Sequence, residues 1–394
     1  MTPAGGVPYV RLSGFYFVYF AVVGALVPYF NPYLQANGYD AEQIGQATAL
    51  LLVGRIVAPG IWGWLADRTG QRLRMVQSTT LMALIAFAGV FWADSFAKMA
   101  VVLLLYGLFW SASLPQFEAI TLNHLGDRLQ DYTRIRLWGS IGFIVTAGLL
   151  GALLQRWGIS LLPAILVGLI ALVYLAGAAI PPEPPSPHVH VQKASFMEIL
   201  RRRGVAVLFF STLVMQLSCG PYYAFYTIFL EERGYSRTVA GLLWALGVAA
   251  EVVLFTVMHR LLPAWGLRRL MLISLAAGVL RWLMVGYGVQ SALVIVLAQL
   301  MHAATFGMHH AAAVQYVHRY FVGRHQGRGQ ALYSSIAYGV GGAVGALVTG
   351  YLWTHLGPAR TFAVAALVCA IGLVAAWRFL EDDPGHHAGR AAAA

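Results

Sequence analysis

Charged residues are scarce in this chain of 394 residues, because Asp, Glu, Lys and Arg together make up only 10% of the composition. Hydrophobic residues make up 59%, and the mean hydropathy of +0.69 is far above that of a soluble globular domain. The deficit of charge excludes an ordinary soluble protein and indicates a membrane protein with several spans.

Cysteine is nearly absent as well. Cys219 and Cys369 lie in apolar segments far apart in the chain, so neither a disulfide framework nor a cysteine-rich metal site is available. The sequence also lacks a G-x-x-x-x-G-K phosphate loop and a nucleophile-and-base motif. We therefore expect no enzymatic activity, no metal and no cofactor.

Acidic residues are the scarcer charge, since 15 Asp and Glu stand against 26 Lys and Arg, which leaves a net charge of +11. The basic residues fall in short hydrophilic loops rather than in one patch, which is typical of membrane orientation and not of nucleic-acid binding. We expect the first apolar run to be a membrane span and not a cleaved signal, because it is already long enough to cross.

Twelve apolar segments are long enough to span a bilayer. They are predicted at 10–34, 43–66, 75–93, 98–122, 135–156, 159–180, 205–230, 238–262, 268–288, 291–317, 328–354 and 358–380. A proline cluster and three arginines separate the sixth from the seventh, and prolines cannot continue a helix. We therefore predict an N-terminal six-helix bundle (1–180), a linker (181–203) and a C-terminal six-helix bundle with a short tail (204–394).

Two sequence echoes relate the halves. Gly70–Met75 (GQRLRM) resembles Gly266–Met271 (GLRRLM) at an offset of 196, and Ser140–Phe143 resembles Ser335–Tyr338 at an offset of 195. Two matches at nearly one offset indicate duplication of a six-helix unit. The fold prediction is an all-α membrane protein of two pseudo-symmetric bundles, which is a transporter architecture.

Basic residues also predict the orientation. If the linker side is cytoplasmic, 19 Lys and Arg lie inside and five outside, and the remaining two, Arg55 and Arg281, lie within spans. This bias predicts that both termini are cytoplasmic. The expected location is the bacterial cytoplasmic (inner) membrane.

The loop between the second and third spans carries the sharpest motif, G-x-x-x-D-R-x-G-x-R, at Gly63–Arg72. It resembles the signature loop of the major facilitator superfamily, and a simple positively charged turn is the alternative. The resemblance implies that this loop governs conformational switching, with Gly63 allowing close helix packing. The switch residues it implies are Gly63, Asp67, Arg68, Gly70 and Arg72.

Within that superfamily the chain resembles the phenylpropionate permease branch, which is similar to lactose permease and to the nucleoside:proton symporters. The resemblance is carried by Asp131–Ser140, Gly234–Phe255, Leu272–Met284 and Gln299–Phe306. This sequence has Thr133 where the family usually has Gly.

Ionisable residues inside the predicted spans are few. Only the carboxyl groups of Glu118 and Glu251 and the guanidinium groups of Arg55 and Arg281 lie well within them, with Arg136 near a helix start. Such charges are expensive in a membrane and are functional candidates by default, although a permanent salt bridge between helices is the alternative. A helical hairpin would bring Glu118 and Arg136 together.

The resemblance to lactose permease implies roles for these positions. Glu118 and Arg136 match its substrate-binding pair, Glu251 and Arg281 match residues for substrate and proton coupling, and His302 matches its helix-ten histidine. The carboxylate expected three residues after that histidine is replaced by Thr305. Our hypothesis is that Glu251, with Glu118 as alternative and His302 as a third candidate, takes a proton as substrate engages Arg136 and Arg281.

Histidines and aromatic residues add further candidates. His302, His309 and His310 cluster without a metal-ligand set, and we expect His309 to be a packed, hydrogen-bonded residue. Tyr222 and Tyr223, together with Tyr19, are predicted to contact a ring of the substrate. Packing within the bundle is the alternative for these tyrosines.

The predicted function is a secondary active transporter that couples a proton to symport of a small organic solute by alternating access. The resemblance favours an aromatic carboxylate such as 3-phenylpropionate. A sugar or nucleoside symporter, an exporter, and a membrane receptor or scaffold that does not transport are the alternatives. The expected partners are the substrate, protons and lipid, with no nucleic acid, and we expect a monomer.

Overall fold

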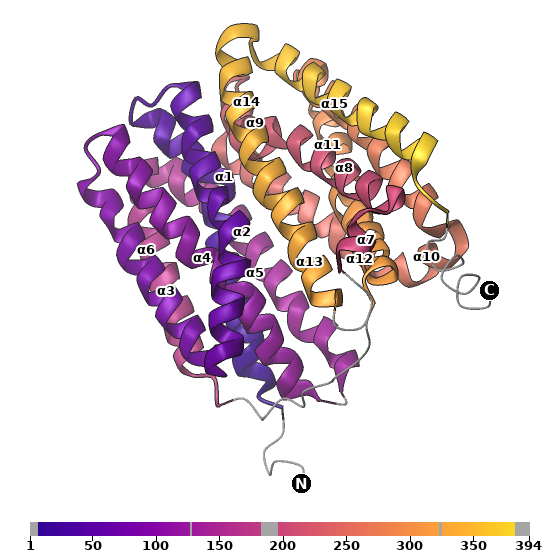
Figure 1. Cartoon of the computed structure of the whole chain (residues 1–394). Coiled ribbons are helices and arrows are strands. Elements are labelled where there is room, and N and C mark those ends of the chain that lie inside the picture. The colour runs from indigo at the N-terminus through magenta and orange to yellow at the C-terminus, as the bar shows by residue number, and fades with distance from the viewer. Residues whose placement is uncertain (1–6, 127, 183–195, 323–324, 383–394) are drawn as a thin grey trace, which may run out of the picture. The chain divides into compact units, whose positions relative to one another are not determined.

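The computed structural model describes residues 7–126, 128–182, 196–322 and 325–382, apart from the side chains of Pro59, Asp67 and Leu129 (Figure 1). The regular elements among these residues are all helices. Elements of the first half are α1 (Tyr9–Ala36), α2 (Ala41–Thr69), α3 (Arg72–Ala88), α4 (Phe96–Leu125), α5 (Tyr132–Trp157) and α6 (Leu162–Ala178).

The second half contains one helix of 52 residues and several shorter, more broken helices. They are α7 (Phe196–Leu200), α8 (Arg203–Ser218), α9 (Gly220–Glu232), α10 (Arg237–Gly288), α11 (Ala292–Leu300), α12 (His309–Tyr320), α13 (Gln326–Ser334), α14 (Gly342–Leu356) and α15 (Pro358–Phe379). Two π-helical segments, Ala303–Met308 and Ser335–Gly341, join α11 to α12 and α13 to α14.

Ten helices of the described chain are long and apolar enough to cross a membrane, and the bent pair Ala41–Ala58 and Gly60–Ala66 adds an eleventh. The helix α10 has 52 residues, about 78 Å at 1.5 Å per residue, which exceeds a bilayer core of about 30 Å. It breaks at Gly266, whose φ of 74° is not helical, so α10 supplies two crossings. The predicted twelve spans are consistent with this arrangement.

Local sequence explains where the helices start and stop. The Asp40 carboxyl accepts from the backbone N–H of Gln43, and the Gln43 side chain accepts from the N–H of Asp40, which is a reciprocal cap at the start of α2. Gly70 ends α2 with a φ of 64°, a conformation that residues with a Cβ rarely adopt. Gly70 and Gly266, the first glycines of the repeated sequence, thus both have positive φ at a helix junction.

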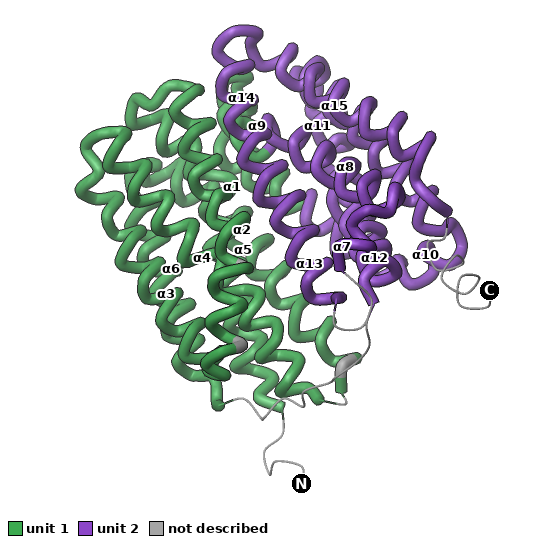
Figure 2. The backbone as a smooth tube through the Cα atoms, in the orientation of Figure 1, with its two compact units in different colours: residues 1–188, 223–246 green, residues 189–222, 247–394 purple. Residues whose placement is uncertain are grey.

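The chain divides into two compact units (Figure 2), residues 1–188 with 223–246, and residues 189–222 with 247–394. The end of α9 and the start of α10 therefore group with the first unit. The bundle boundaries at 180 and 204, which rest on the proline cluster and the arginines of the linker, stay a prediction.

In the first unit, α1 packs against α5, and α4 packs against α2 and α3. Backbones touch where glycine removes the side chain, because a Cβ on Gly54 would collide with the Gly107 carbonyl, and a Cβ on Gly142 with the Phe17 carbonyl. Small residues allow this close approach between membrane helices.

In the second unit, α8 packs against α15 and against the helix that contains Ser335–Gly341 and α14. A Cβ on Gly341 would lie 2.9 Å from the Leu213 carbonyl and one on Gly345 would lie 2.6 Å from the Leu217 carbonyl. The core of this unit includes the fully buried Trp282 and, unusually, the side chain of Arg281.

Candidate functional site

A carboxyl group and a guanidinium group meet inside the first unit, as the hairpin spacing predicts. Arg136, near the start of α5, lies 3.9 Å from Glu118 of α4, between Nε and Oε1. The two side chains are 30% and 38% exposed. At this distance the ion pair lacks a direct hydrogen bond, so both groups keep capacity for another partner.

Aromatic rings hold the arginine of this pair. The guanidinium carbon of Arg136 lies 4.1 Å from the ring centre of Phe20 and 5.5 Å from that of Tyr16, both on α1. A cation over an aromatic face gains about 0.5–2 kcal/mol. The Tyr132 hydroxyl also interacts electrostatically with the Glu118 carboxyl group. Sequence reasoning missed Phe20 and Tyr132, although Tyr132 lies four residues before Arg136 and thus on the same helix face.

Tyr19 and Arg55 lie next to the same aromatic region. Tyr19 is 5% exposed and stacks on Trp110 with ring centres 4.3 Å apart. Arg55 is exposed and interacts electrostatically with the hydroxyls of Tyr19 and Tyr106. Tyr19 is thus packed in the bundle in this structure, and Arg55 lies close to it.

Arg281 is the centre of a second cluster, in the second unit, and is only 1% exposed. Its Nε donates to the Ala298 carbonyl at 2.9 Å and its Nη2 donates to Gln299 Oε1 at 2.9 Å. Its Nη1 donates to Thr305 Oγ1 at 2.8 Å and lies 3.2 Å from His302 Nδ1. Thr305, the departure from the family pattern, is therefore a neutral partner for this arginine.

The same contact determines the tautomer of His302. A guanidinium group only donates, so Nδ1 of His302 is the acceptor, and its Nε2 carries the hydrogen. Nε2 lies 3.6 Å from Oε2 of Glu251, whose side chain is 16% exposed. Glu251 and Arg281 thus have His302 between them, with one ring nitrogen toward each.

Tyr222 and Tyr223 are consecutive in α9 and have different surroundings. Tyr222 is 1% exposed, its hydroxyl accepts from Gln299 Nε2 at 3.3 Å, and its ring lies 4.3 Å below the Arg281 guanidinium. Tyr223 belongs to the first unit, is partly exposed and stacks on Trp244. In this conformation Tyr222 supports Arg281 and is not accessible to a ligand.

His309 is buried and hydrogen-bonded, as expected. Its Nδ1 lies 2.8 Å from Ser274 Oγ, and because that hydroxyl donates to the Met271 carbonyl at 2.7 Å, Nδ1 of His309 is the donor. The neighbouring His310 contacts tyrosines instead: its Nδ1 lies 2.9 Å from the hydroxyls of both Tyr333 and Tyr338.

The signature loop lies at the junction of α2 and α3. Arg68 is exposed and lies 5.2 Å from the Trp64 ring centre, Gly70 ends α2, and Arg72 begins α3. The side chain of Asp67 lies outside the described part of the chain. The predicted close packing at Gly63 is wrong: no described atom lies within 4 Å of a Cβ built on it. Gly54, which precedes Gly63 in α2, makes a close approach instead, to the backbone of Gly107.

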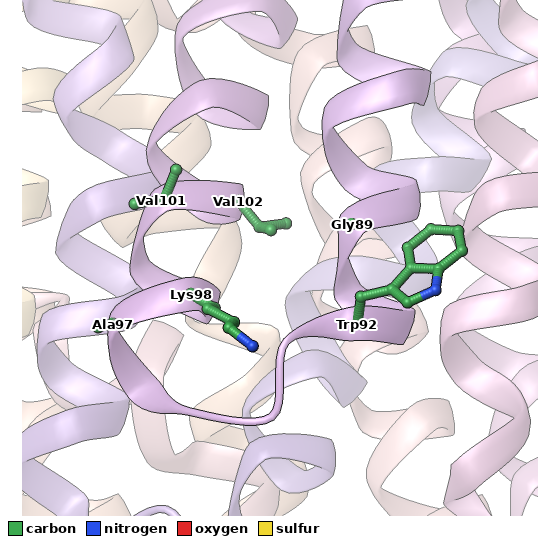
Figure 3. Close-up of a pocket in the computed structure, with 6 residues that line it drawn as sticks. All are labelled: Gly89, Trp92, Ala97, Lys98, Val101 and Val102. Carbon is green, nitrogen blue, oxygen red and sulfur yellow. The ribbon is translucent and has the colours of Figure 1, made fainter.

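No group of three or more His, Cys, Asp or Glu side chains with metal-site geometry occurs among the described residues. An open pocket of about 450 Å³ lies between Gly89–Trp92 and the start of α4 (Figure 3). Its lining is Gly89, Trp92, Ala97, Lys98, Val101 and Val102, and Lys98 pairs with Asp94 at 2.6 Å. None of the predicted site residues lines it, so we assign it no ligand.

Comparisons with known proteins agree with the helical architecture. The chain matches the model of the MFS_1 like family over residues 9–364. It is 31% identical over 363 residues to the probable 3-phenylpropionic acid transporter of Escherichia coli, and the alignment covers 90% of this chain and 93% of that protein. It is 27% identical over 349 residues to the maltose permease of Geobacillus stearothermophilus, covering 86% of each.

A crystal structure of a mutant of the nucleoside transporter NupG has a similar fold. The TM-score is 0.82, and the match covers 94% of this chain and 98% of that one at 18% sequence identity.

Proposed function

The chain belongs to the MFS_1 like family, so it is a multi-pass membrane transporter and not an enzyme, and on that premise we propose that it is a proton-coupled symporter of an aromatic carboxylate such as 3-phenylpropionate. Transport proceeds by alternating access, and the protein acts as a monomer in the bacterial cytoplasmic membrane with both termini inside.

The substrate carboxylate binds Arg136 in this proposal. The observation that carries it is the loose pair of Arg136 with Glu118 at 3.9 Å, with both side chains about one third exposed. A substrate carboxylate would form a bidentate hydrogen bond with a guanidinium group that this carboxyl does not engage closely. The rings of Phe20 and Tyr16 beside the guanidinium suit a substrate that carries an aromatic ring.

Glu251 is the proposed proton acceptor of the second unit, with Glu118 as the alternative. His302 acts as a neutral bridge, because its Nδ1 accepts from Arg281 and its Nε2–H is directed toward Glu251. Arg281 holds this bridge in place. To contact substrate, its guanidinium would first have to break the hydrogen bonds to its four acceptors. Tyr222 and Tyr19 reach a ligand only after a conformational change, whereas Tyr223 is already partly exposed.

The 31% identity to the Escherichia coli protein supports an aromatic acid over other substrates. The match to a maltose permease keeps a sugar as the second candidate, because a stack of aromatic residues such as Tyr19 on Trp110 also suits a sugar ring. The experiment below tests whether the substrate is instead a nucleoside and whether the protein binds its ligand without transporting it.

The test is accumulation of labelled 3-phenylpropionate in proteoliposomes with an imposed pH difference. One proton moving with one monocarboxylate anion transfers no net charge, so each pH unit supports about tenfold accumulation. A neutral sugar or nucleoside moved with one proton would respond to the same pH difference and, unlike the acid, also to a membrane potential, by about 50-fold per 100 mV. Labelled maltose and uridine are therefore measured alongside the acid.

The Glu251→Gln variant tests the coupling. We expect it to lose accumulation, with a ratio near one, and to keep counterflow exchange, because a neutral side chain mimics the protonated state. Glu198→Gln, at an exposed position of α7, is the matched control. Unchanged accumulation by Glu251→Gln refutes the coupling role, and the absence of exchange of any probe by the wild-type protein refutes transport of these solute classes.

A further inference from the structure

His310 and two tyrosines form a polar and aromatic cluster that the proposed coupling does not use. Nδ1 of His310 lies 2.9 Å from each of the hydroxyls of Tyr333 and Tyr338, and these two hydroxyls lie 3.3 Å apart. Tyr333 is 1% exposed, whereas His310 and Tyr338 are partly exposed. The cluster therefore has a fixed inner side and an accessible outer side.

Phe306 connects this cluster to the proposed coupling residues. Its ring is almost parallel to that of His302, at 6° with centres 5.4 Å apart, and to that of His310, at 10° with centres 6.1 Å apart. The three rings lie four residues apart along one helix face. Tyr338 approaches the same phenyl ring at 6.2 Å. One continuous face thus runs from His302 through Phe306 to His310 and Tyr338.

The two central rings of this face lie on irregular backbone. Phe306 is in the π-helical segment Ala303–Met308 and Tyr338 is in the π-helical segment Ser335–Gly341. Such turns are rare and are found frequently at functional sites. One such segment carries Phe306 and the other carries Tyr338, and these two rings are in contact. The presence of irregular turns on both sides of one contact indicates a recognition surface and not simple packing.

The accessible polar groups of this face argue for a ligand. Phe306 alone would suit a lipid contact, but an imidazole and a phenolic hydroxyl within membrane-spanning helices are expensive to expose to hydrocarbon. The same face also includes His302, which contacts Glu251 and Arg281. His302 itself is buried, whereas the partly exposed end at His310 and Tyr338 suits a polar, substrate-accessible space.

We propose that Phe306 and Tyr338 receive the ring of the transported substrate and determine its specificity. His310 and Tyr333 are positioning residues, because they hold the Tyr338 hydroxyl and thereby the angle of its ring. The class of ligand is a small solute with a planar aromatic ring. This inference rests on the proposed transport function but not on the carboxylate contact at Arg136.

The experiment measures ligand preference with the purified full-length protein. Dissociation constants are determined for 3-phenylpropionate, 3-cyclohexylpropionate and hexanoate, which share a carboxylate and differ in the apolar part. An aromatic pair contributes about a twofold to tenfold gain in affinity. We expect the wild-type protein to prefer the phenyl acid and the variants Phe306→Leu and Tyr338→Leu to lose that preference by about this factor each.

The positioning role has its own readout. His310→Leu is expected to reduce the phenyl preference, and His310→Asn to restore it, because an amide can replace Nδ1 as the partner of the tyrosine hydroxyls. A purely structural role would weaken all three acids equally. Tyr351→Leu removes an exposed aromatic ring of α14 elsewhere in the second unit and is the matched control.

Failure of this inference is distinguishable from failure of the proposed function. If the wild-type protein prefers the phenyl acid and both leucine variants keep that preference, the ring surface is refuted while aromatic-acid transport stands. Uridine is measured in the same series. If the acids do not bind and uridine does, weakening of uridine by both variants supports the ring surface, and unchanged affinity refutes it. Absence of binding by every ring-bearing probe overturns both.

Discussion

Substitution of Arg281 by lysine separates a supporting role of this arginine from direct substrate binding. The guanidinium donates to Ala298 O, Gln299 Oε1 and Thr305 Oγ1, and Nη1 also faces Nδ1 of His302. Lysine keeps the charge but has three donors on one nitrogen, without the planar fork. At least one of the four contacts is therefore lost.

The magnitude follows from these contacts. A hydrogen bond to a charged group contributes about 1.5–3 kcal/mol, and a buried acceptor left without a donor costs about as much. The contacts of the Arg281 guanidinium with the rings of Tyr222 and Trp282, at 4.3 and 4.7 Å from their centres, are also weakened. We expect a loss of about 2–4 kcal/mol, or a fall in Tm of about 2–5 °C for a chain of this length.

The assay is thermal unfolding of purified protein, with and without 3-phenylpropionate. Arg378→Lys, an exposed arginine of α15 in the same unit, is the matched control and is expected to leave Tm unchanged. If Arg281→Lys unfolds at the wild-type temperature and loses only the ligand-induced shift, the supporting role is refuted and Arg281 binds substrate directly.

Two further predictions concern the first unit. Arg136→Lys removes the bidentate donor beside Glu118, so we expect 3-phenylpropionate to bind about tenfold more weakly. The Tm should change little, because both side chains of the pair are partly exposed. A large fall in Tm would instead assign the pair a structural role. Gly241→Ala places a Cβ against the Tyr29 hydroxyl and the Ala147 carbonyl, and we expect it to lower the free energy of unfolding by about 1–3 kcal/mol, measured by thermal unfolding. Gly168→Ala has open space around the added Cβ and should be neutral or slightly stabilising. Equal Tm values for these two alanine variants would contradict the predicted collision at Gly241.

Much of the architecture was predictable from the sequence because it depends on one-dimensional patterns. Apolar runs of about 20 residues determine the spans, and glycine alone suits the positive φ at Gly70 and Gly266. The pairing of Glu118 with Arg136 was also predictable, because a short hairpin between adjacent helices leaves few other partners for either charge. The helix break at Cys219 and the π-helical segments Ala303–Met308 and Ser335–Gly341 were not predictable, since hydropathy does not distinguish a continuous α-helix from a broken or π-helical one.

By itself, the sequence determined that this protein is a membrane transporter and which few ionisable side chains lie inside its spans, whereas the duplication of a six-helix unit stays a prediction. Only the tertiary structure decided that His302 lies between Arg281 and Glu251, that Thr305 is a neutral partner for the arginine, and that Phe306 meets Tyr338. The physical reason is that hydropathy and charge act along the chain, whereas hydrogen bonding and ring contacts depend on which helix faces meet. That choice is made by packing between residues far apart in sequence.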